Sequence, residues 1–211
     1  MTQRRPAPRL YLVTPELNDT GSFVGDLDAA LGSADIAAVL LRLADADERT
    51  LVNRAKAVAA VVQHRDIALL LDGRPEIVGR AGADGAHLTG IEAFTAALPT
   101  LKPDRIAGAG GLRSRHDAML AGESGADYVM FGEHDRRGNT PPREAVLERV
   151  KWWADLVEVP CIGYAASADE VRPLALAGAD FVALGDWLWT QPQSIGAAVT
   201  AAASALAEPV P

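Results

Sequence analysis

Cysteine is nearly absent from this 211-residue chain, because Cys161 stands alone. A single cysteine excludes an internal disulfide framework and fits a reducing compartment, so we expect a cytoplasmic protein in which Cys161 is a buried small hydrophobe and not a nucleophile. No apolar run approaches the roughly 18 residues of a membrane-spanning helix. The first nine residues carry arginines, but no signal-like apolar stretch follows them. The sequence therefore predicts neither export nor a membrane partner.

Lysine is scarce as well. Lys56, Lys102 and Lys151 are the only lysines among twenty basic residues, and the net charge is −8. The basic residues are scattered and do not form the concentrated patch that a nucleic-acid backbone requires, which argues against a nucleic-acid partner. None of the three lysines lies within an expected strand or at its carboxyl end, so Schiff-base aldolase chemistry is disfavoured.

The chain does contain short apolar runs at near-even spacing. Each run is almost continuously apolar, the pattern of a parallel strand with both faces covered. The eight expected strands are 9–14, 36–43, 67–72, 85–89, 105–111, 128–133, 160–165 and 181–186.

Segments of helical period lie between these strands, and helix start signals precede several of them. Ser114 and Ser167 stand in N-cap-like positions, and Pro141-Pro142 places the start of the sixth helix near residue 141. A Gly-Ala-Asp junction also recurs immediately before strands, in AGADG (81 to 85), SGADY (124 to 128) and AGADF (177 to 181). Its glycine suits a left-handed helix end.

Eight strand and helix units within about 210 residues predict an α/β protein, a single (β/α)8 TIM barrel over residues 1–211, with residues 1–8 as a flexible tail. An open, doubly wound sheet is the alternative. AGAGGL (107 to 112) lacks the GxGxxG spacing of a nucleotide-binding sheet and so does not favour it.

Ligands of such barrels bind where the loops leave the carboxyl ends of the strands. The residues expected there share polar, charged or glycine character. They are Arg42, Asp72, Gly73, Arg74, His87, Glu92, Gly110, Gly111, Arg113, Glu133, His134, Asp135, Arg136, Arg137, Gly163, Tyr164 and Asp186.

The chain resembles the thiamine-phosphate synthase and thiazole tautomerase family over nearly its whole length. The matching segments are LYLVTP (10 to 15), LLRLAD (40 to 45), LDGRPEIVGRAGADGAHL (71 to 88), SGADYVMFG (124 to 132) and AGADFVALGD (177 to 186). The resemblance implies a barrel in which the synthase couples a hydroxymethylpyrimidine diphosphate to a thiazole phosphate, with Mg²⁺ on the diphosphate.

Several functional positions of this family are replaced. Arg42 alone survives from a Gln-x-Arg-x-Lys run, while Asp72 and Glu92 stand near the family's metal-binding aspartates. Gly110 or Gly111 takes the place of a serine, and the loop EHDRRGNT (133 to 140) replaces a loop that carries threonine and lysine. Arg136, Arg137 and Thr140 are candidate anion binders in that loop, since arginine forks onto phosphate oxygens.

The phosphate cup departs furthest from the family. Its Gly-Gly pair reads Gly163-Tyr164, and the serine that opens the last loop is Asp186. A backbone cradle needs glycine for close approach, and a carboxylate beside a phosphate is repulsive unless a cation intervenes.

The main hypothesis is a synthase-like protein with a phosphorylated small-molecule ligand, whether active or diverged. Its candidate catalytic residues are Arg42, Asp72, Arg74, Glu133 and His134; its phosphate-binding candidates are Gly110, Gly111, Arg136, Thr140, Gly163, Tyr164 and Asp186; and its metal ligands are Asp72 and Glu92.

Other interpretations stay open at this point. One is a non-catalytic or regulatory binding barrel with a remodelled cup. Another is a metal-dependent lyase or isomerase that uses His87, Glu133, His134 and Asp186. Individual residues have plainer roles too: Asp72 would cap a helix that begins at Pro75, and His87 would be a satisfied core histidine. Trp187 and Trp189 would wall an apolar pocket or form a homodimer interface.

Overall fold

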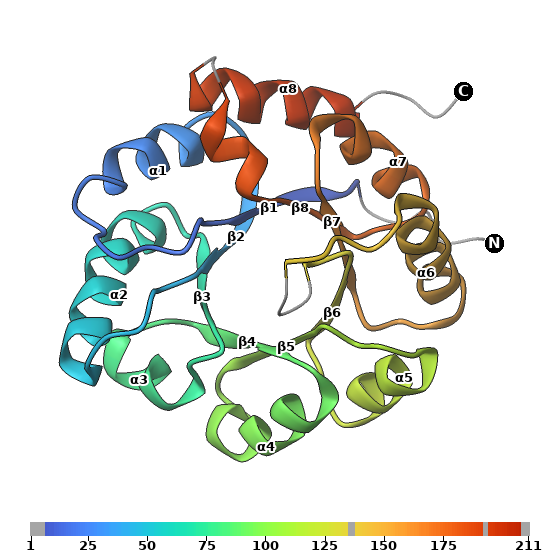
Figure 1. The fold of residues 1–211 in the computed structure, drawn as a ribbon, viewed down its shortest axis with the longest axis horizontal. Helices are drawn as coiled ribbons and strands as arrows, with labels where there is room; N and C mark the ends of the chain where they lie inside the picture. The colour runs from blue at the N-terminus through green and yellow to red at the C-terminus, as the bar shows by residue number, and fades with distance from the viewer. Residues whose placement is uncertain (1–6, 135–137, 192–193, 208–211) are drawn as a thin grey trace.

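The fold is a closed barrel of parallel strands surrounded by helices (Figure 1). The computed structural model describes residues 7–134, 138–191 and 194–207. Within these residues the strands follow one another around the barrel in sequence order. They are β1 (Arg9–Val13), β2 (Ile36–Leu41), β3 (Ala68–Asp72), β4 (Gly85–Thr89), β5 (Ile106–Gly110), β6 (Tyr128–Phe131), β7 (Cys161–Ala165) and β8 (Phe181–Leu184). The predicted (β/α)8 barrel is confirmed, and the open-sheet alternative is wrong.

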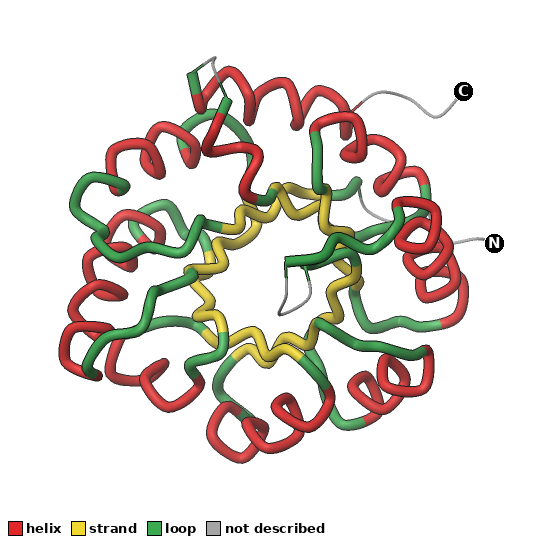
Figure 2. The backbone as a smooth tube through the Cα atoms, viewed as in Figure 1, coloured by secondary structure: helices red, strands yellow, loops and turns green. Residues whose placement is uncertain are grey.

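Helices form the outer layer of the barrel (Figure 2). They are α1 (Val24–Leu31), α2 (Glu48–Gln63), α3 (Val78–Ala81), α4 (Ile91–Leu101), α5 (Arg115–Glu123), α6 (Arg143–Leu156), α7 (Val171–Leu176) and α8 (Ile195–Ala207). Short 3₁₀ turns η1 (Pro75–Ile77), η2 (Ala168–Glu170) and η3 (Asp186–Thr190) follow the ends of β3, β7 and β8.

Two apolar layers explain why the strands are continuously hydrophobic. The larger layer packs the outer face of the sheet against the helices and includes Trp153 and Phe94, both fully buried. The smaller layer fills the barrel interior with residues such as Val13, Leu40 and Met130. Because alternate residues of a strand face opposite layers, both faces must be apolar.

The predicted helix starts are largely confirmed. Ser114 caps α5 in a reciprocal capping box with Asp117, and Pro142 stands at the cap of α6. Ser167 does occupy the N-cap position of η2, but its hydroxyl bonds to Asp169 and not to the η2 backbone. Asp72 caps nothing, because Arg74 holds the cap position of η1.

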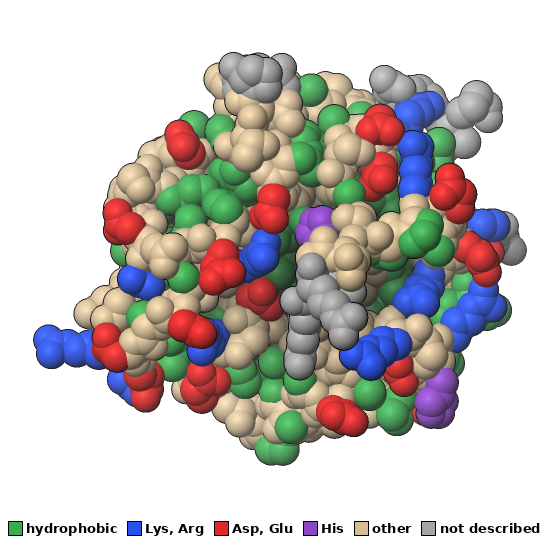
Figure 3. Space-filling view, in the orientation of Figure 1, with side chains coloured by type: hydrophobic (Ala, Val, Ile, Leu, Met, Phe, Trp, Pro, Cys, Tyr) green, Lys and Arg blue, Asp and Glu red, His purple; other side chains and the backbone are tan. Residues whose placement is uncertain are grey.

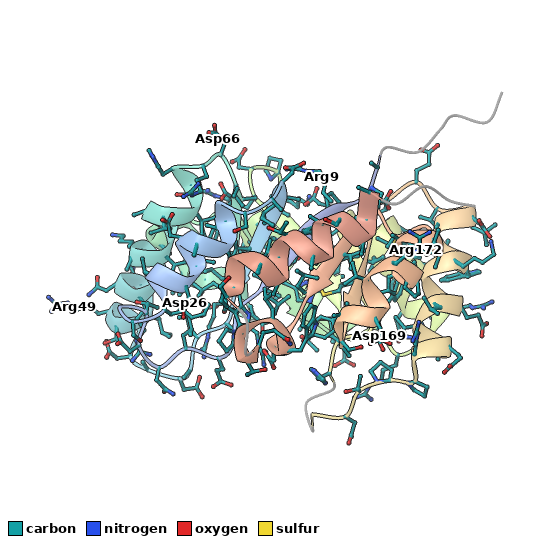
Figure 4. The ribbon with its side chains drawn as sticks, turned by 90° about the horizontal axis from the view of Figure 1, so that it is seen from above. Arg9, Asp26, Arg49, Asp66, Asp169 and Arg172 are labelled. Carbon is teal, nitrogen blue, oxygen red and sulfur yellow. The ribbon has the colours of Figure 1, made fainter. Side chains whose placement is uncertain are left out.

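The repeated Gly-Ala-Asp junction supports the amino-terminal end of the barrel. The carboxylates of Asp84, Asp127 and Asp180 accept hydrogen bonds from the backbone of Leu69, Ala107 and Cys161, at 2.7 to 2.8 Å. Each aspartate therefore ties its own strand to the strand before it. In the side view, Arg9 and Asp66, which begin or precede strands, lie at one end, and Asp169, which follows β7, lies at the other (Figure 4). The repeat builds the end opposite the one where the candidate residues lie.

Candidate functional site

The candidate residues gather at the carboxyl ends of the strands. The face shown in Figure 3 has acidic and basic side chains around its centre. Arg42 follows β2, Asp72 ends β3, Glu133 follows β6 and Asp186 follows β8. Segments far apart in the sequence thus meet at one mouth, because parallel strands of a barrel end on the same side.

Arg42 lies between two carboxylates at this mouth. Its Nη1 is 3.1 Å from Oδ1 of Asp186, and its Nε is 3.8 Å from Oδ2 of Asp72. The Arg42 backbone is held from below, since its N–H donates to the hydroxyl of the fully buried Thr14 at 3.0 Å. The guanidinium is therefore anchored at its backbone and paired at its tip.

The surroundings of Asp72 shift the pKa of its carboxyl group. Burial raises its pKa and Glu133 adds to this, while His87 and Arg42 work in the opposite direction. The net effect is a raised pKa, which means that the ionised form is held in an unfavourable place. Such a carboxylate gains from any cation that enters the mouth.

Two other predicted residues, Arg74 after β3 and Glu92 in α4, form no hydrogen bond or ion pair with Asp72 among the described residues. Arg74 pairs with the carboxylate of Asp45. Glu92 is exposed in the first turn of α4. The prediction of Arg74 as a catalytic residue and of Glu92 as a metal ligand therefore gains no support from the geometry.

A buried chain of hydrogen bonds crosses the barrel interior and ends at the mouth. The hydroxyls of Tyr11 and Tyr128 are 3.1 Å apart, Nδ1 of His87 is 2.9 Å from the Tyr128 hydroxyl, and Nε2 of His87 is 2.7 Å from Oε1 of Glu133. The second carboxylate oxygen, Oε2, accepts the Gly111 N–H at 2.9 Å. Burial raises the pKa of both tyrosines, so both are neutral phenols.

Two glycines of β5 make this chain possible. In the register of the sheet, Gly108 stands between His87 of β4 and Tyr128 of β6. A Cβ on Gly108 would overlap the Tyr128 ring, and a Cβ on Gly110 would overlap both the Glu133 carboxylate and the His87 ring. The missing side chains therefore leave the path along which Tyr128 and Glu133 reach His87. Gly110 and Gly111 serve Glu133 here, although the sequence predicted them as phosphate binders.

Tyr164 fills the position predicted for the phosphate cup. A Cβ on Gly185 would overlap its hydroxyl, and a Cβ on Gly163 would lie 2.8 Å from Leu174 of α7. Burial, with the neighbouring Asp186 carboxylate, raises the pKa of Tyr164 to about 12, although a hydrogen bond from the Asp186 backbone opposes the rise. The phenol thus occupies the space beside Gly185, and Gly163 gives room to α7.

The loop after β6 contributes two further groups. Nδ1 of His134 is 3.0 Å from the Thr140 hydroxyl, and its ring packs edge-on to Tyr164 with centroids 5.5 Å apart. Arg136, predicted as an anion binder, lies outside the described residues, as does Arg137. Both His134 and Thr140 line a cavity of about 250 Å³, and His134 also lines a neighbouring cavity of about 80 Å³.

The two tryptophans after Asp186 are tied to the scaffold. The indole N–H of Trp187 donates to the Ala165 carbonyl at 2.9 Å, and that of Trp189 donates to the Val13 carbonyl at 2.7 Å. Both carbonyls belong to the last residues of strands. These tryptophans hold the η3 loop onto the ends of β1 and β7, and they line neither of the two cavities.

The protein donors do not fit a resident metal ion. Among the residues that the structure describes, no group of three histidine, cysteine, aspartate or glutamate side chains is placed to hold one. Of the four residues in the lyase or isomerase alternative, His87 and Glu133 bond to each other, while His134 contacts Thr140 and Asp186 pairs with Arg42. The alternative therefore has no common ligand group.

Fold and site together define a class, the (β/α)8 barrels that hold a small molecule at the carboxyl ends of their strands. The chain belongs to the thiamine monophosphate synthase family, whose model matches residues 10–187. In the described part of the chain, the helices are all too short or too polar to cross a bilayer.

Sequence relatives extend over most of the chain. A thiamine-phosphate synthase of Rhodospirillum centenum is 39% identical over 194 residues, covering 90% of this chain and 94% of the relative. Another, from Hyphomonas neptunium, is 35% identical over 210 residues and covers 94% of both. The chain is thus a thiamine-phosphate-synthase-like protein of thiamine biosynthesis.

Solved structures share the fold. A thiamine phosphate pyrophosphorylase from Pyrococcus furiosus superposes with a TM-score of 0.78 at 20% identity, over 94% of this chain and 95% of that one. A 3-hexulose-6-phosphate synthase superposes with a TM-score of 0.73 at 14% identity, over 94% of this chain and 100% of the other. At such identities these structures support the fold alone.

Proposed function

We propose that this chain couples a hydroxymethylpyrimidine diphosphate to a thiazole phosphate at the mouth of the barrel. The observation that carries the proposal is the placement of Arg42, the arginine that survives from the family's Gln-x-Arg-x-Lys run, at the carboxyl end of β2 beside Asp72. The relatives named thiamine-phosphate synthase support the choice of reaction.

Arg42 is available to a diphosphate at small cost. Its present partner, Asp186, has a side chain that is 48% exposed, and an ion pair at such a site contributes about 1 kcal/mol or less. A guanidinium offers five donors in a planar fork that matches phosphate oxygens. An entering diphosphate therefore exchanges a weak ion pair for charge-assisted hydrogen bonds, and it places the leaving group against a fixed positive charge.

In this proposal Mg²⁺ arrives with the diphosphate. Mg²⁺ is commonly bound through one or two carboxylates together with substrate phosphates, so a complete protein site is not required. Asp72 is the carboxylate beside Arg42, and burial, together with the nearby negative charge of Glu133, raises its pKa. A cation on the substrate would relieve that repulsion.

In place of a glycine cradle, the thiazole phosphate would contact side chains at this corner of the mouth. Tyr164, beside Asp186, offers a neutral phenol hydroxyl. We propose that this hydroxyl takes over from the lost cup, while Arg42 holds the diphosphate. Binding of this second substrate is then weaker than in a chain with an open cradle, because a backbone nest adds several aligned N–H dipoles.

The test is the coupling reaction itself, with both substrates and Mg²⁺ and with thiamine phosphate measured by chromatography. We expect product from the wild-type chain, and a loss of roughly 100-fold or more in Arg42→Met, since one charge-assisted contact to the reacting group contributes about 3 kcal/mol. Arg65→Met is the matched control, because Arg65 forms a surface ion pair with Asp28. Equal rates in all three proteins, or no product from the wild type, would overturn the proposal.

A second candidate is a binding barrel without turnover, favoured by the Tyr164 hydroxyl in the cup. It predicts that the wild-type chain is inactive with both substrates, and that Tyr164→Gly with Asp186→Ser restores binding of the thiazole phosphate. Isothermal calorimetry with the thiazole phosphate separates the two candidates: measurable binding to the wild-type chain favours the synthase, and binding only to the double variant favours the diverged barrel.

A further inference from the structure

Glu133 occupies a position between two cavities. It stands two residues after β6, beyond Gly132, whose φ of 104° turns the chain inward at a conformation that favours glycine. Its side chain is 16% exposed and lines both the cavity of about 250 Å³ and the cavity of about 80 Å³. The Glu133 carboxylate is therefore placed to contact a ligand in either cavity.

Both oxygens of this carboxylate are fixed in orientation. Oε1 faces Nε2 of His87 at 2.7 Å, and Oε2 accepts the Gly111 N–H at 2.9 Å. An ionised carboxylate has about four acceptor directions on its two oxygens. Two are used here, so each oxygen keeps one acceptor direction for a ligand. The pair forms a fork that accepts two N–H donors at once.

The buried chain behind Glu133 holds His87 in one orientation. A carboxylate only accepts, so Nε2 of His87 must carry a proton toward Glu133. When His87 is neutral, Nδ1 accepts from Tyr128 and the Tyr128 oxygen accepts from Tyr11. Every donor in this arrangement then has an acceptor. Burial opposes a charge on His87, but Glu133 and Asp72 outweigh it and raise its pKa, and the protonated ring also presents Nε2–H to Glu133.

The space in front of Glu133 has a defined chemistry. The smaller cavity is walled by Val13, Leu40 and Met130, and its charged groups are Arg42, Asp72 and Glu133. Arg42 serves the diphosphate on its own side of this cavity, while the uncompensated carboxylate of Glu133 favours a hydrogen-bond donor on the other side. The apolar walls suit a flat ring, and the fork suits an amino group beside a ring nitrogen that carries a proton, so that both groups donate to the carboxylate.

We propose that Glu133 is the specificity-determining residue of this barrel, which binds the N–H edge of an amino-substituted nitrogen heterocycle, and that His87 and Tyr128 are its positioning residues. The inference rests on the proposed function for the choice of heterocycle, a 4-aminopyrimidine. The inference assigns ligand recognition to the Glu133 carboxylate, which begins the segment 133–140 that stands in place of the family's typical loop.

The test compares two unphosphorylated probes by calorimetry. One is 4-amino-5-hydroxymethyl-2-methylpyrimidine, and the other is the same molecule without its amino group. We expect the wild-type chain to prefer the amino compound by about tenfold or more, as sites built to hydrogen-bond a ligand do. In Glu133→Gln, which keeps shape and loses charge, the preference falls to about threefold or less, since hydrogen bonds to charged groups are about twice as strong as neutral ones. Glu123 is an exposed residue at the end of α5, so Glu123→Gln is the matched control, and we expect it to keep the wild-type preference.

Variants of His87 distinguish a role in orienting the Glu133 carboxylate from a role in the stability of the fold. His87→Gln retains a donor that can face Oε1 of Glu133, whereas His87→Leu removes it. We expect His87→Gln to keep most of the preference for the amino compound and His87→Leu to lose it. Circular dichroism shows which variants are folded, and Glu133→Asp, which withdraws the carboxylate, is measured if Glu133→Gln does not fold; it too should lose the preference.

Two outcomes overturn the inference: a wild-type chain that binds both probes equally or not at all, and a Glu133→Gln chain with the full preference. The coupling assay is read separately. A chain that selects the amino compound but makes no thiamine phosphate keeps this inference and loses the proposed function. If Glu133→Gln makes thiamine phosphate at the wild-type rate and keeps the wild-type preference between the probes, the proposed function stands and this inference fails.

Discussion

The hydroxyl of Tyr164 lies against Gly185, in the space that any side chain at residue 185 would occupy. Tyr164 is the penultimate residue of β7, Gly185 directly follows the neighbouring strand β8, and the Tyr164 ring reaches across to the turn that precedes Asp186. The cup at this corner of the mouth is therefore closed from within, by a residue of the strand and not by a covering loop.

The first prediction follows from this contact. Gly185→Ala lowers the free energy of unfolding by about 1 to 3 kcal/mol, because the added methyl group overlaps the Tyr164 ring. The leucine side chain in Tyr164→Leu is shorter than tyrosine, so in this variant Gly185→Ala lowers the free energy of unfolding by less. Urea denaturation of the four proteins in a double-mutant cycle measures the coupling. Effects that add within about 0.5 kcal/mol would show that the two residues are independent.

Gly110→Ala tests the path through which Glu133 reaches His87. A methyl group here overlaps both side chains, so the free energy of unfolding falls by about 1 to 3 kcal/mol and the preference for the amino compound is lost. Gly79→Ala is the control, since a Cβ at this helical position has nothing within 4 Å. It raises the free energy of unfolding by about 0.5 to 1 kcal/mol. A harmless Gly110→Ala would contradict the described packing.

The pH dependence of stability reports on His87. Its raised pKa means that the folded state favours the protonated ring. The stabilisation is full below the ordinary pKa of 6.5 and is lost as the pH rises through the raised value. Urea denaturation between pH 6 and pH 9 should show a fall in the free energy of unfolding that His87→Gln lacks. Parallel curves for the two proteins would refute the assignment.

Asp72→Asn separates stability from function. Burial and Glu133 raise the pKa of Asp72, so its stabilisation is present below the ordinary value of 3.8 and is lost as the pH rises. At pH 7 the ionised carboxylate therefore costs stability. We expect Asp72→Asn to unfold at higher urea concentration than the wild type at pH 7, with a smaller difference at pH 4, while the coupling rate falls. A less stable and fully active variant would contradict both roles.

Local sequence signals predicted most of the fold. The eight apolar runs and the helix caps depend on neighbouring residues, and the barrel follows from their alternation. The same logic brought Arg42, Asp72 and Asp186 to one mouth, because each stands where a strand ends. Local sequence signals could not predict that Arg42 pairs with both carboxylates, because the directions of these side chains depend on the closure of the barrel.

The buried chain was the part that sequence reasoning missed. The sequence alone leaves His87 as a core histidine or a catalytic one, and it presents Tyr11 and Tyr128 only as apolar strand residues. Their contact depends on the register of β4, β5 and β6 around Gly108. The available signal was the glycine alternation in 105–111, since glycines inside a strand mark places where another group approaches closely.

Phosphorus NMR follows both substrates and both products of the proposed coupling in one experiment. With both substrates, Mg²⁺ and the wild-type chain, we expect the pyrimidine diphosphate and thiazole phosphate signals to disappear together, and thiamine phosphate and inorganic pyrophosphate to appear in equal amounts. Folded Arg42→Met should leave the substrates unchanged over the same time. Unchanged substrates with folded wild-type protein, or pyrophosphate release without thiamine phosphate, would contradict the claim that this mouth couples the two.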